Sequence, residues 1–214
     1  MTALTIQQRD LIAAAFQSAV EEVVVEHYPA VTQEHQLTSR IAQRIEDRLN
    51  NLNLAGVTLR VSTQELPDKG RGAAESRLGA DLWITLTLQN EFSKGFLVQS
   101  KWQGDRDFGR YVDQCERMLN VSKSSYGWEF GRNGVRVYGA KRVIARSAYH
   151  DRYTLDFGRK IQTVLKKILD CREGDYALGI PSGVNPRDHM SSMIQDWNAQ
   201  AAVSLEIIQS DPRD

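Results

Sequence analysis

Three polar residues lie near the ends of two apolar runs, and their side chains could bind a metal ion beside a phosphate. Asp81 opens the run Asp81–Gln89, while Gln99 and Lys101 belong to the run Phe96–Trp102. Carboxylate and carbonyl oxygens suit Mg²⁺, and an ammonium group can stabilise charge that develops at phosphorus. These residue types therefore indicate metal-assisted hydrolysis of a phosphodiester.

The alternation of side chains predicts that both runs are β-strands. In the first run, aliphatic residues at even positions alternate with Asp81 and other residues at odd positions. A period of two is typical of a strand. In the second run, Gln99 and Lys101 share one face because side chains two apart point the same way. The segment 89–95 between the runs is polar and ends in glycine, so we expect a turn there.

An antiparallel hairpin across that turn would bring the polar side chains together. With Leu88 near Phe96, Asp81 falls within one or two rungs of Gln99 and Lys101. A charged lysine inside an apolar run is costly unless another charge compensates it. We therefore expect Lys101 to face an aspartate and a bound metal.

Glu34 is a second acid that we expect at the same place. Residues 33–50 show apolar side chains every four positions, which predicts a helix, and Glu34 falls at the centre of its apolar stripe. Glu46 and Asp47, the other acids of this segment, point well away from the stripe. Taken alone, an acid in the first turn is also explained by the helix dipole.

Composition is that of an ordinary globular chain. The 214 residues are 41% hydrophobic and 25% charged, which fits one sizeable domain or a domain with an appendage. No apolar run reaches the roughly 20 residues that span a bilayer, and we expect no signal peptide. Cys115 and Cys171 are isolated, without zinc-ligand spacing. We therefore expect a cytoplasmic protein that does not enter a membrane.

Charge is distributed unevenly although the formal net charge is zero. The segment 130–169 holds ten basic residues and two acidic ones, and clustered cations can neutralise phosphates. A solvated surface explains any single one of them equally well. The candidate nucleic-acid contacts are Arg132, Arg136, Lys141, Arg142 and Arg146. Because the whole chain is neutral, we expect binding to need a homo-oligomer or a partner protein.

The remaining pattern predicts one α/β domain with a mixed central sheet. The expected helices are 4–27, 33–50, 108–121, 155–171 and 188–209, and the expected strands are 57–61, 81–89, 96–102, 126–130 and 135–138. Residues 142–145 are expected to continue the strand system. We expect a domain over 1–171 that includes the N-terminal helix. Residues 172–214 are expected to form a loop and helix appendage packed on it.

These residues resemble the PD-(D/E)xK phosphodiesterase superfamily, which has the restriction-endonuclease-like fold. In that family an aspartate begins one core strand and a (D/E/Q)-x-K triplet lies on the next, after a helix that carries a glutamate. The matching positions are Asp81, Gln99-Ser100-Lys101 and Glu34. The glutamine of the triplet is similar to the Mrr-like branch and to antiphage-defence nucleases. The resemblance covers about residues 33–145.

The resemblance implies a restriction-endonuclease-like fold with extra terminal helices and a Mg²⁺-dependent or Mn²⁺-dependent nuclease. DNA is the favoured substrate, in a bacterial restriction or antiphage-defence system. Asp81 and Glu34 would hold the metal, with the backbone carbonyl of Ser100, and Gln99 and Lys101 would complete the catalytic set. Gln99 departs from the commoner carboxylate, and Glu75 is a possible substitute for Glu34.

Two other functions remain open from the sequence. The neutral Gln99 also fits a catalytically inactive subunit of the same fold that binds nucleic acid or a partner. An immunity or interaction protein that docks through its terminal helices is the second. No Walker-type phosphate loop is present, so control by an ATPase, a helicase or self-association is expected.

Overall fold

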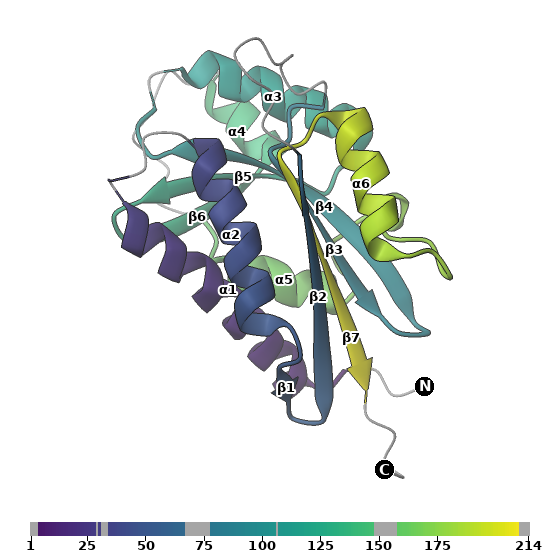
Figure 1. Ribbon diagram of the computed structural model, residues 1–214. Helices are drawn as coiled ribbons and strands as arrows, with labels where there is room; N and C mark the ends of the chain where they lie inside the picture. Colours follow the sequence, from purple (N-terminus) through teal and green to yellow (C-terminus); the bar gives the residue numbers. More distant parts are fainter. Residues whose placement is uncertain are drawn as a thin grey trace.

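A seven-stranded mixed sheet forms the centre of the protein in this computed structural model, which describes residues 4–28, 30, 34–66, 78–105, 107–147 and 158–209 (Figure 1). The order across the sheet is β1-β2-β7-β3-β4-β5-β6. The strands are β1 (Asn53–Leu54), β2 (Val57–Glu65), β3 (Leu82–Leu88), β4 (Phe92–Trp102), β5 (Ser125–Gly131), β6 (Gly134–Gly139) and β7 (Ala201–Gln209).

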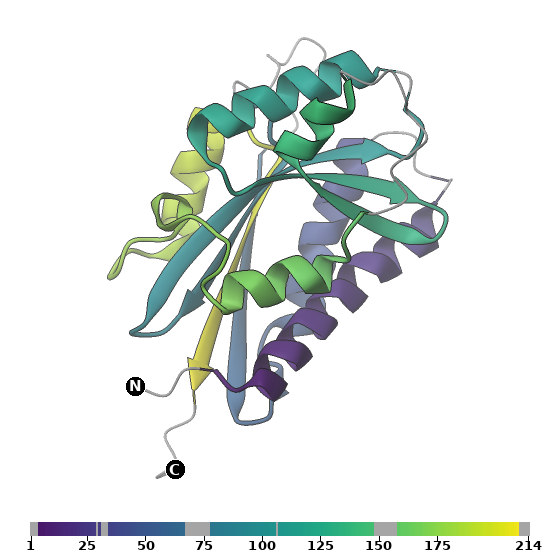
Figure 2. The same ribbon diagram turned by 180° about the vertical axis from the view of Figure 1, so that it is seen from behind.

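Helices cover both faces of this sheet (Figures 1 and 2). The helices are α1 (Ile6–His27), α2 (Glu34–Leu49), α3 (Phe108–Val121), α4 (Ala140–Ser147), α5 (Ile161–Leu169), the 3₁₀ helix η1 (Tyr176–Leu178) and α6 (Pro186–Trp197). Buried residues of α1, α2 and α5 form one apolar cluster with the sheet, and those of α3, α4 and α6 form a second. The predicted α/β class, with a mixed central sheet flanked by helices, is confirmed.

Side chains of β3 and β4 alternate between the two faces of the sheet, so each apolar cluster receives every second residue. Leu82 and Ile84 belong to the α1–α2–α5 cluster, whereas Trp83 and Leu97 belong to the α3–α4–α6 cluster. Both sides of these strands are therefore buried, as is usual where helices cover each face of a sheet. Within the described part of the chain, no helix combines the length and apolar character needed to cross a bilayer.

The hairpin of β3 and β4 is tighter than the sequence predicts. Leu88 pairs with Phe92, so the expected contact with Phe96 is wrong by four residues. Asn90 takes the left-handed conformation that a short turn needs (φ 64°). Gly95 lies within β4, and a side chain there would meet the carbonyl oxygen of Leu178 at 2.2 Å. This glycine therefore permits the close approach of η1 and does not mark a turn.

The C-terminal region differs most from the prediction. The expected helix 188–209 is α6 followed by β7, and Asn198 ends α6 in a left-handed conformation. Strand β7 lies between β2 and β3, antiparallel to the first and parallel to the second. Residues 172–214 are therefore not an appendage to a domain that ends at 171, because β7 is a central strand of the shared sheet.

Two smaller corrections concern the segment after the Asn-Gly hairpin of β5 and β6. The helix α4 contains residues 142–145, which were expected to continue the strands. A helix expected over 155–171 is α5, which begins at Ile161, and residues 155–157 lie outside the described ranges. The helices predicted at 4–27, 33–50 and 108–121 are confirmed within a few residues at their ends.

Candidate active site

Asp81 lies beside Gln99 and Ser100, as the alternation predicts. The Asp81 N–H donates to the Val98 carbonyl at 2.8 Å, which aligns the start of β3 with β4. Gln99 Nε2 donates to Asp81 Oδ2 at 2.7 Å, and the Ser100 N–H donates to the same oxygen at 2.8 Å. The backbone and side chain of the triplet therefore both orient the Asp81 carboxylate.

Glu34 reaches the same strand from the first turn of α2. Lys101 Nζ lies 3.1 Å from Glu34 Oε2, and the Trp102 N–H donates to Glu34 Oε1 at 3.1 Å. Asp81 and Gln99 lie toward α3, whereas α2 covers the opposite face of the sheet. The side chains therefore form two pairs at the C-terminal end of β4, Asp81 with Gln99 and Glu34 with Lys101. Lys101 bonds to Glu34 and acts on Asp81 through its charge.

Asp105 and Glu129 adjoin Lys101, and neither is among the site residues that the sequence predicts. Asp105 Oδ2 is 3.7 Å from Lys101 Nζ, and Glu129 on β5 pairs in register with Lys101. Glu129 in turn holds Arg146 at 2.8 Å. A sequence signal existed only for Asp105, which lies four residues after Lys101 in a polar segment.

Burial raises the pKa of Asp81 to about 7. Loss of hydration is the largest cause; the Ser100 N–H and the charge of Lys101 oppose it, while Glu34 adds to it. Burial likewise raises the pKa of Glu129, against the opposing charge of Arg146. Asp81 therefore changes its charge near neutral pH, and a bound cation would favour its ionised form.

The Asp81→Asn variant is expected to remove a pH-dependent loss of stability. Because the folded-state pKa of Asp81 is about 7 and its ordinary value is 3.8, the folded state binds more protons between these values. The free energy of unfolding of the wild type therefore falls as pH rises through that window. The stability of the variant relative to the wild type should grow by about 1–4 kcal/mol from about pH 4 to about pH 8. Urea unfolding without metal measures this difference, and a pH-independent difference would contradict the prediction.

The oxygens around Asp81 fit a small, oxygen-liganded cation. Gln99 is 2% exposed, and its Oε1 has no hydrogen-bond partner. An unpartnered buried carbonyl oxygen is costly, so it suits a ligand or a bound water. The Ser100 carbonyl lies beside it and accepts from Gln99 Nε2 at 3.1 Å. The described residues hold no group of three His, Cys, Asp or Glu side chains placed to bind a metal, and Glu75 lies outside them. The oxygens that lie together here are therefore those of one carboxylate, Asp81, and the neutral oxygens of Gln99 and Ser100.

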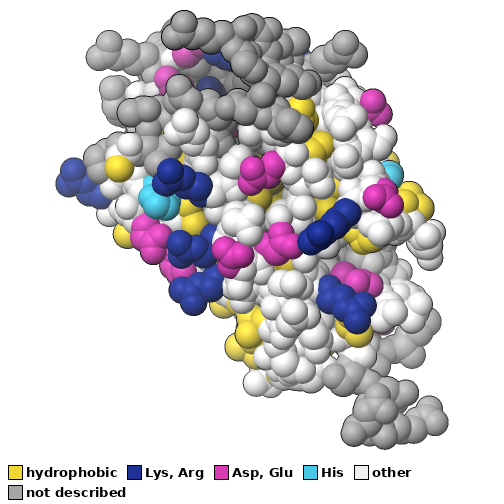
Figure 3. All heavy atoms as spheres, viewed as in Figure 1, with side chains coloured by type: hydrophobic (Ala, Val, Ile, Leu, Met, Phe, Trp, Pro, Cys, Tyr) yellow, Lys and Arg dark blue, Asp and Glu magenta, His cyan; other side chains and the backbone are white. Residues whose placement is uncertain are grey.

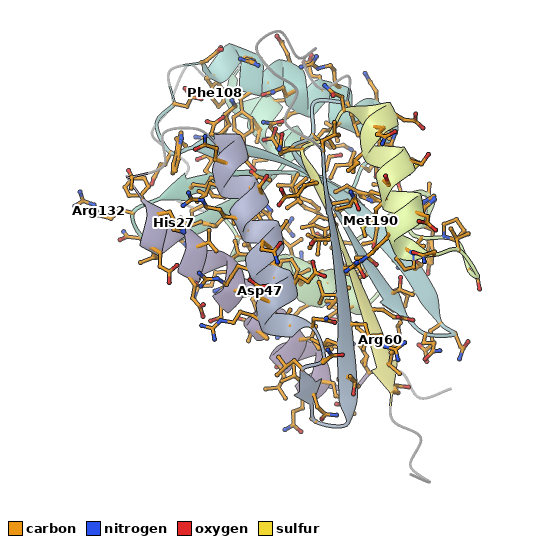
Figure 4. All side chains as sticks on the ribbon, viewed as in Figure 1. His27, Asp47, Arg60, Phe108, Arg132 and Met190 are labelled. Atoms are coloured by element: carbon orange, nitrogen blue, oxygen red, sulfur yellow. The ribbon has the colours of Figure 1, made fainter. Side chains whose placement is uncertain are left out.

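The predicted nucleic-acid contacts separate into two groups. Arg132, Arg136, Lys141 and Arg142 are exposed, and Figure 4 shows Arg132 extending away from the fold. The side chain of Arg146 is only 8% exposed and is paired with Glu129. Its guanidinium lies 5.0 Å and 5.5 Å from the ring centroids of two aromatic residues, Tyr138 and Phe108. Arg146 is therefore an internal ion-pair residue, and the other four remain candidate phosphate contacts.

The outer surface of α1 and α2 carries charges of both signs. Figure 3 shows basic and acidic side chains interspersed on this face. Arg44 bonds to Glu22 and Glu26, and Arg48 bonds to Glu22. The arginines lower the pKa of Glu22. Since α1 carboxylates already balance these α2 arginines, this face is a poor candidate for phosphate binding.

Fold and site together define an α/β protein with a polar cluster at the end of a central strand. Neither a protein-family model, nor a curated protein, nor a solved structure matches this chain. The geometry of the site is therefore the guide to function, because folds alone do not determine chemistry.

Proposed function

We propose that this protein is a metal-dependent nuclease that hydrolyses phosphodiester bonds, with DNA as the favoured substrate. The supporting observation is that two polar pairs lie side by side at the C-terminal end of β4. Gln99 bonds to Asp81 at 2.7 Å, and Lys101 bonds to Glu34 at 3.1 Å. The similarity of these positions to the PD-(D/E)xK superfamily supports the same chemistry. It also supports a setting in bacterial restriction or antiphage defence.

The carboxylates of Asp81 and Glu34 are the groups proposed to hold Mg²⁺ or Mn²⁺. The Oε1 of Gln99 and the carbonyl of Ser100 add neutral oxygens to this set. Such a cation polarises a phosphoryl oxygen and lowers the pKa of a bound water. Because the Nε2 amino group of Gln99 donates a hydrogen bond to Asp81, it also holds that carboxylate in one orientation.

Lys101 is proposed to place its positively charged ammonium group beside the scissile phosphate. Its ammonium group lies between Glu34 and Asp105, and its side chain is 8% exposed. A charge held in a partly dehydrated site acts more strongly on a developing negative charge than one in water does. If Glu34 binds the cation, the Asp105 carboxylate still balances the charge of Lys101. Lys101 can then donate to a phosphoryl oxygen or orient the attacking water.

An inactive nucleic-acid-binding or partner-binding subunit is the second candidate function. Two observations favour it. Lys101 forms an ion pair with the Glu34 carboxylate that would have to bind the metal, and the neutral Gln99 stands where the family more often has a carboxylate. Calorimetric titration with Mn²⁺ separates the two functions. A nuclease should show saturable heat that Asp81→Ala removes, whereas the inactive subunit should show none.

Cleavage of DNA by the purified protein tests the proposal directly. With Mg²⁺ or Mn²⁺ the wild type should nick or linearise supercoiled plasmid, and a chelator should stop the reaction. Asp81→Ala should lose the activity while keeping its circular dichroism spectrum. Asp47→Ala is the matched control, because Asp47 is exposed on α2 outside the site (Figure 4). Equal cleavage by Asp81→Ala and the wild type would overturn the proposal.

A partner protein such as an ATPase or helicase, or a second copy of the chain, is part of the proposed system. Arg132, Arg136, Lys141 and Arg142 supply few exposed cations for unaided binding of a polyanion, and the net charge of the chain is zero. Cleavage assays should therefore be run over a wide range of protein concentration and at low salt.

A further inference from the structure

Two hydroxyl groups meet between α2 and β4, just behind the candidate active site. Thr38 is 1% exposed and Ser100 is fully buried. Thr38 Oγ1 lies 3.1 Å from Ser100 Oγ and 3.0 Å from the Glu34 carbonyl oxygen. A hydroxyl both donates and accepts, so Thr38 can bond to the first turn of its helix and to β4 together.

Ser100 is the residue through which the site groups are connected. Its N–H holds Asp81 Oδ2, and its carbonyl accepts from Gln99 Nε2. Its hydroxyl meets Thr38, which is one helical turn after Glu34. The Thr38–Ser100 contact therefore joins the part of the site on β4 to the turn that carries Glu34.

The surroundings of this pair are otherwise apolar. Leu37 and Ile41 are both fully buried on α2. Apolar contacts are non-directional, so they fix the position of a helix on a sheet less specifically than a hydrogen bond does. A buried hydroxyl pair is directional, because separating it leaves two polar groups unsatisfied. Together with the bond from the Trp102 N–H to Glu34, the pair therefore favours one placement of α2 on β4.

We propose that Thr38 and Ser100 are positioning residues that set the Glu34 carboxylate relative to Asp81 and Lys101. This inference rests on the proposed nuclease function, since its consequence is the geometry of that site. Neither hydroxyl touches the substrate. They act through Glu34, whose Oε1 is held by the Trp102 N–H two residues after Ser100.

Another buried threonine provides the matched control. Thr85 on β3 is fully buried, and its Oγ1 has no hydrogen-bond partner. Replacing it with the isosteric valine removes a buried hydroxyl as Thr38→Val does, but it breaks no link to the site. Thr85→Val should therefore leave activity unchanged and should not lower stability.

The test compares Thr38→Val, Thr38→Ser, Ser100→Ala, the double variant Thr38→Val/Ser100→Ala and Thr85→Val in the 214-residue chain. The measured quantities are the Mn²⁺ concentration for half-maximal DNA cleavage and the maximal rate. Thr38→Val and Ser100→Ala should raise that Mn²⁺ concentration by about 10-fold, as loss of groups that orient metal ligands does. Thr38→Ser should behave as the wild type. The double variant should need no more Mn²⁺ than the more impaired of the two single variants. Each single substitution already removes the same Thr38–Ser100 interaction, so their effects should not add.

A second measurement reports the position of Glu34 without any enzyme activity. The Trp102 backbone amide resonance depends on its bond to Glu34, so Thr38→Val should move it and quicken its hydrogen exchange, while Thr85→Val should not. If Thr38→Val leaves both the Mn²⁺ dependence and the Trp102 amide as in the wild type, the positioning role is overturned. If the wild type cleaves no DNA, the proposed function fails, and the Trp102 amide alone decides the positioning role. Ser100→Ala gives the same comparison if Thr38→Val does not fold.

Discussion

Lys101→Met is expected to lower the rate of DNA cleavage by about 10²–10³-fold while the protein remains folded. Methionine preserves most of the length and the apolar stem of lysine but removes the ammonium group beside Glu34 and Asp105. The variant therefore removes the charge proposed to stabilise the transition state, and it should alter the maximal rate more than the apparent affinity for DNA. Steady-state cleavage of a fluorescent duplex in Mg²⁺ measures both quantities.

Lys94→Met is the matched control for this variant. Lys94 is on the same strand and is 3% exposed, but its ammonium group lies 4.4 Å from the ring centroid of Tyr176, away from the site. It should retain nuclease activity although it loses the cation–π contact with Tyr176. If both variants lose activity equally, the effect is one of folding and the assignment of Lys101 is wrong. Lys101→Arg, which keeps the charge in another geometry, should recover only part of the rate.

The core of the site was predictable because its geometry is local. Asp81, Gln99 and Lys101 lie on two strands joined by a short turn, so the alternation of side chains alone brings them to one end. The predicted pairing was wrong by four residues, yet Asp81 still met Gln99, because a shift by an even number leaves each side chain on the same face. Glu34 was found from its place on an apolar stripe.

The residues that adjoin this core were not predictable in the same way. Glu129 pairs in register with Lys101 only because β5 runs parallel to β4 after the crossover through α3. Thr38 lies on the inward face of α2, but its hydroxyl partner is on a strand 62 residues away. Such contacts are set by strand order and helix placement, and a single sequence does not encode either in a local pattern.

The largest error concerned β7, and its cause is also physical. Six of the nine residues of 201–209 are buried, and a short, largely apolar run is as consistent with a buried strand as with a helix segment. Asn198, in its left-handed conformation, was a stop signal for the preceding helix. The parallel pairing of β7 with β3 joins segments that are far apart in sequence, so hydrophobic periodicity gave no indication of it.

Because β7 is central, Ile207→Asp is expected to unfold the protein, whereas Ile208→Asp should not. Ile207 is fully buried and pairs with Leu59 on β2 and with Leu88 on β3. An aspartate there loses the apolar contacts and buries a carboxyl group, which together cost at least about 4 kcal/mol. That is a large share of the roughly 5–15 kcal/mol that stabilises a typical domain. Ile208, the next residue, is partly exposed on the opposite face, and the same change there should cost about 1 kcal/mol.

Urea unfolding followed by tryptophan fluorescence measures both variants, and the buried Trp83 and Trp128 make the signal sensitive to the whole sheet. The loss of stability should appear in one cooperative unfolding transition of the whole sheet. The reason is that β7 joins β2 to the β3–β4 hairpin that carries Asp81 and Lys101. DNA cleavage should disappear with Ile207→Asp and persist with Ile208→Asp. If the 172–214 region were instead an appendage, Ile207→Asp would leave a folded, active domain over 1–171. The wild type would then show two unfolding transitions, and the variant would lose only the one that belongs to the appendage. Cleavage activity in a soluble Ile207→Asp protein would therefore contradict the central position of β7.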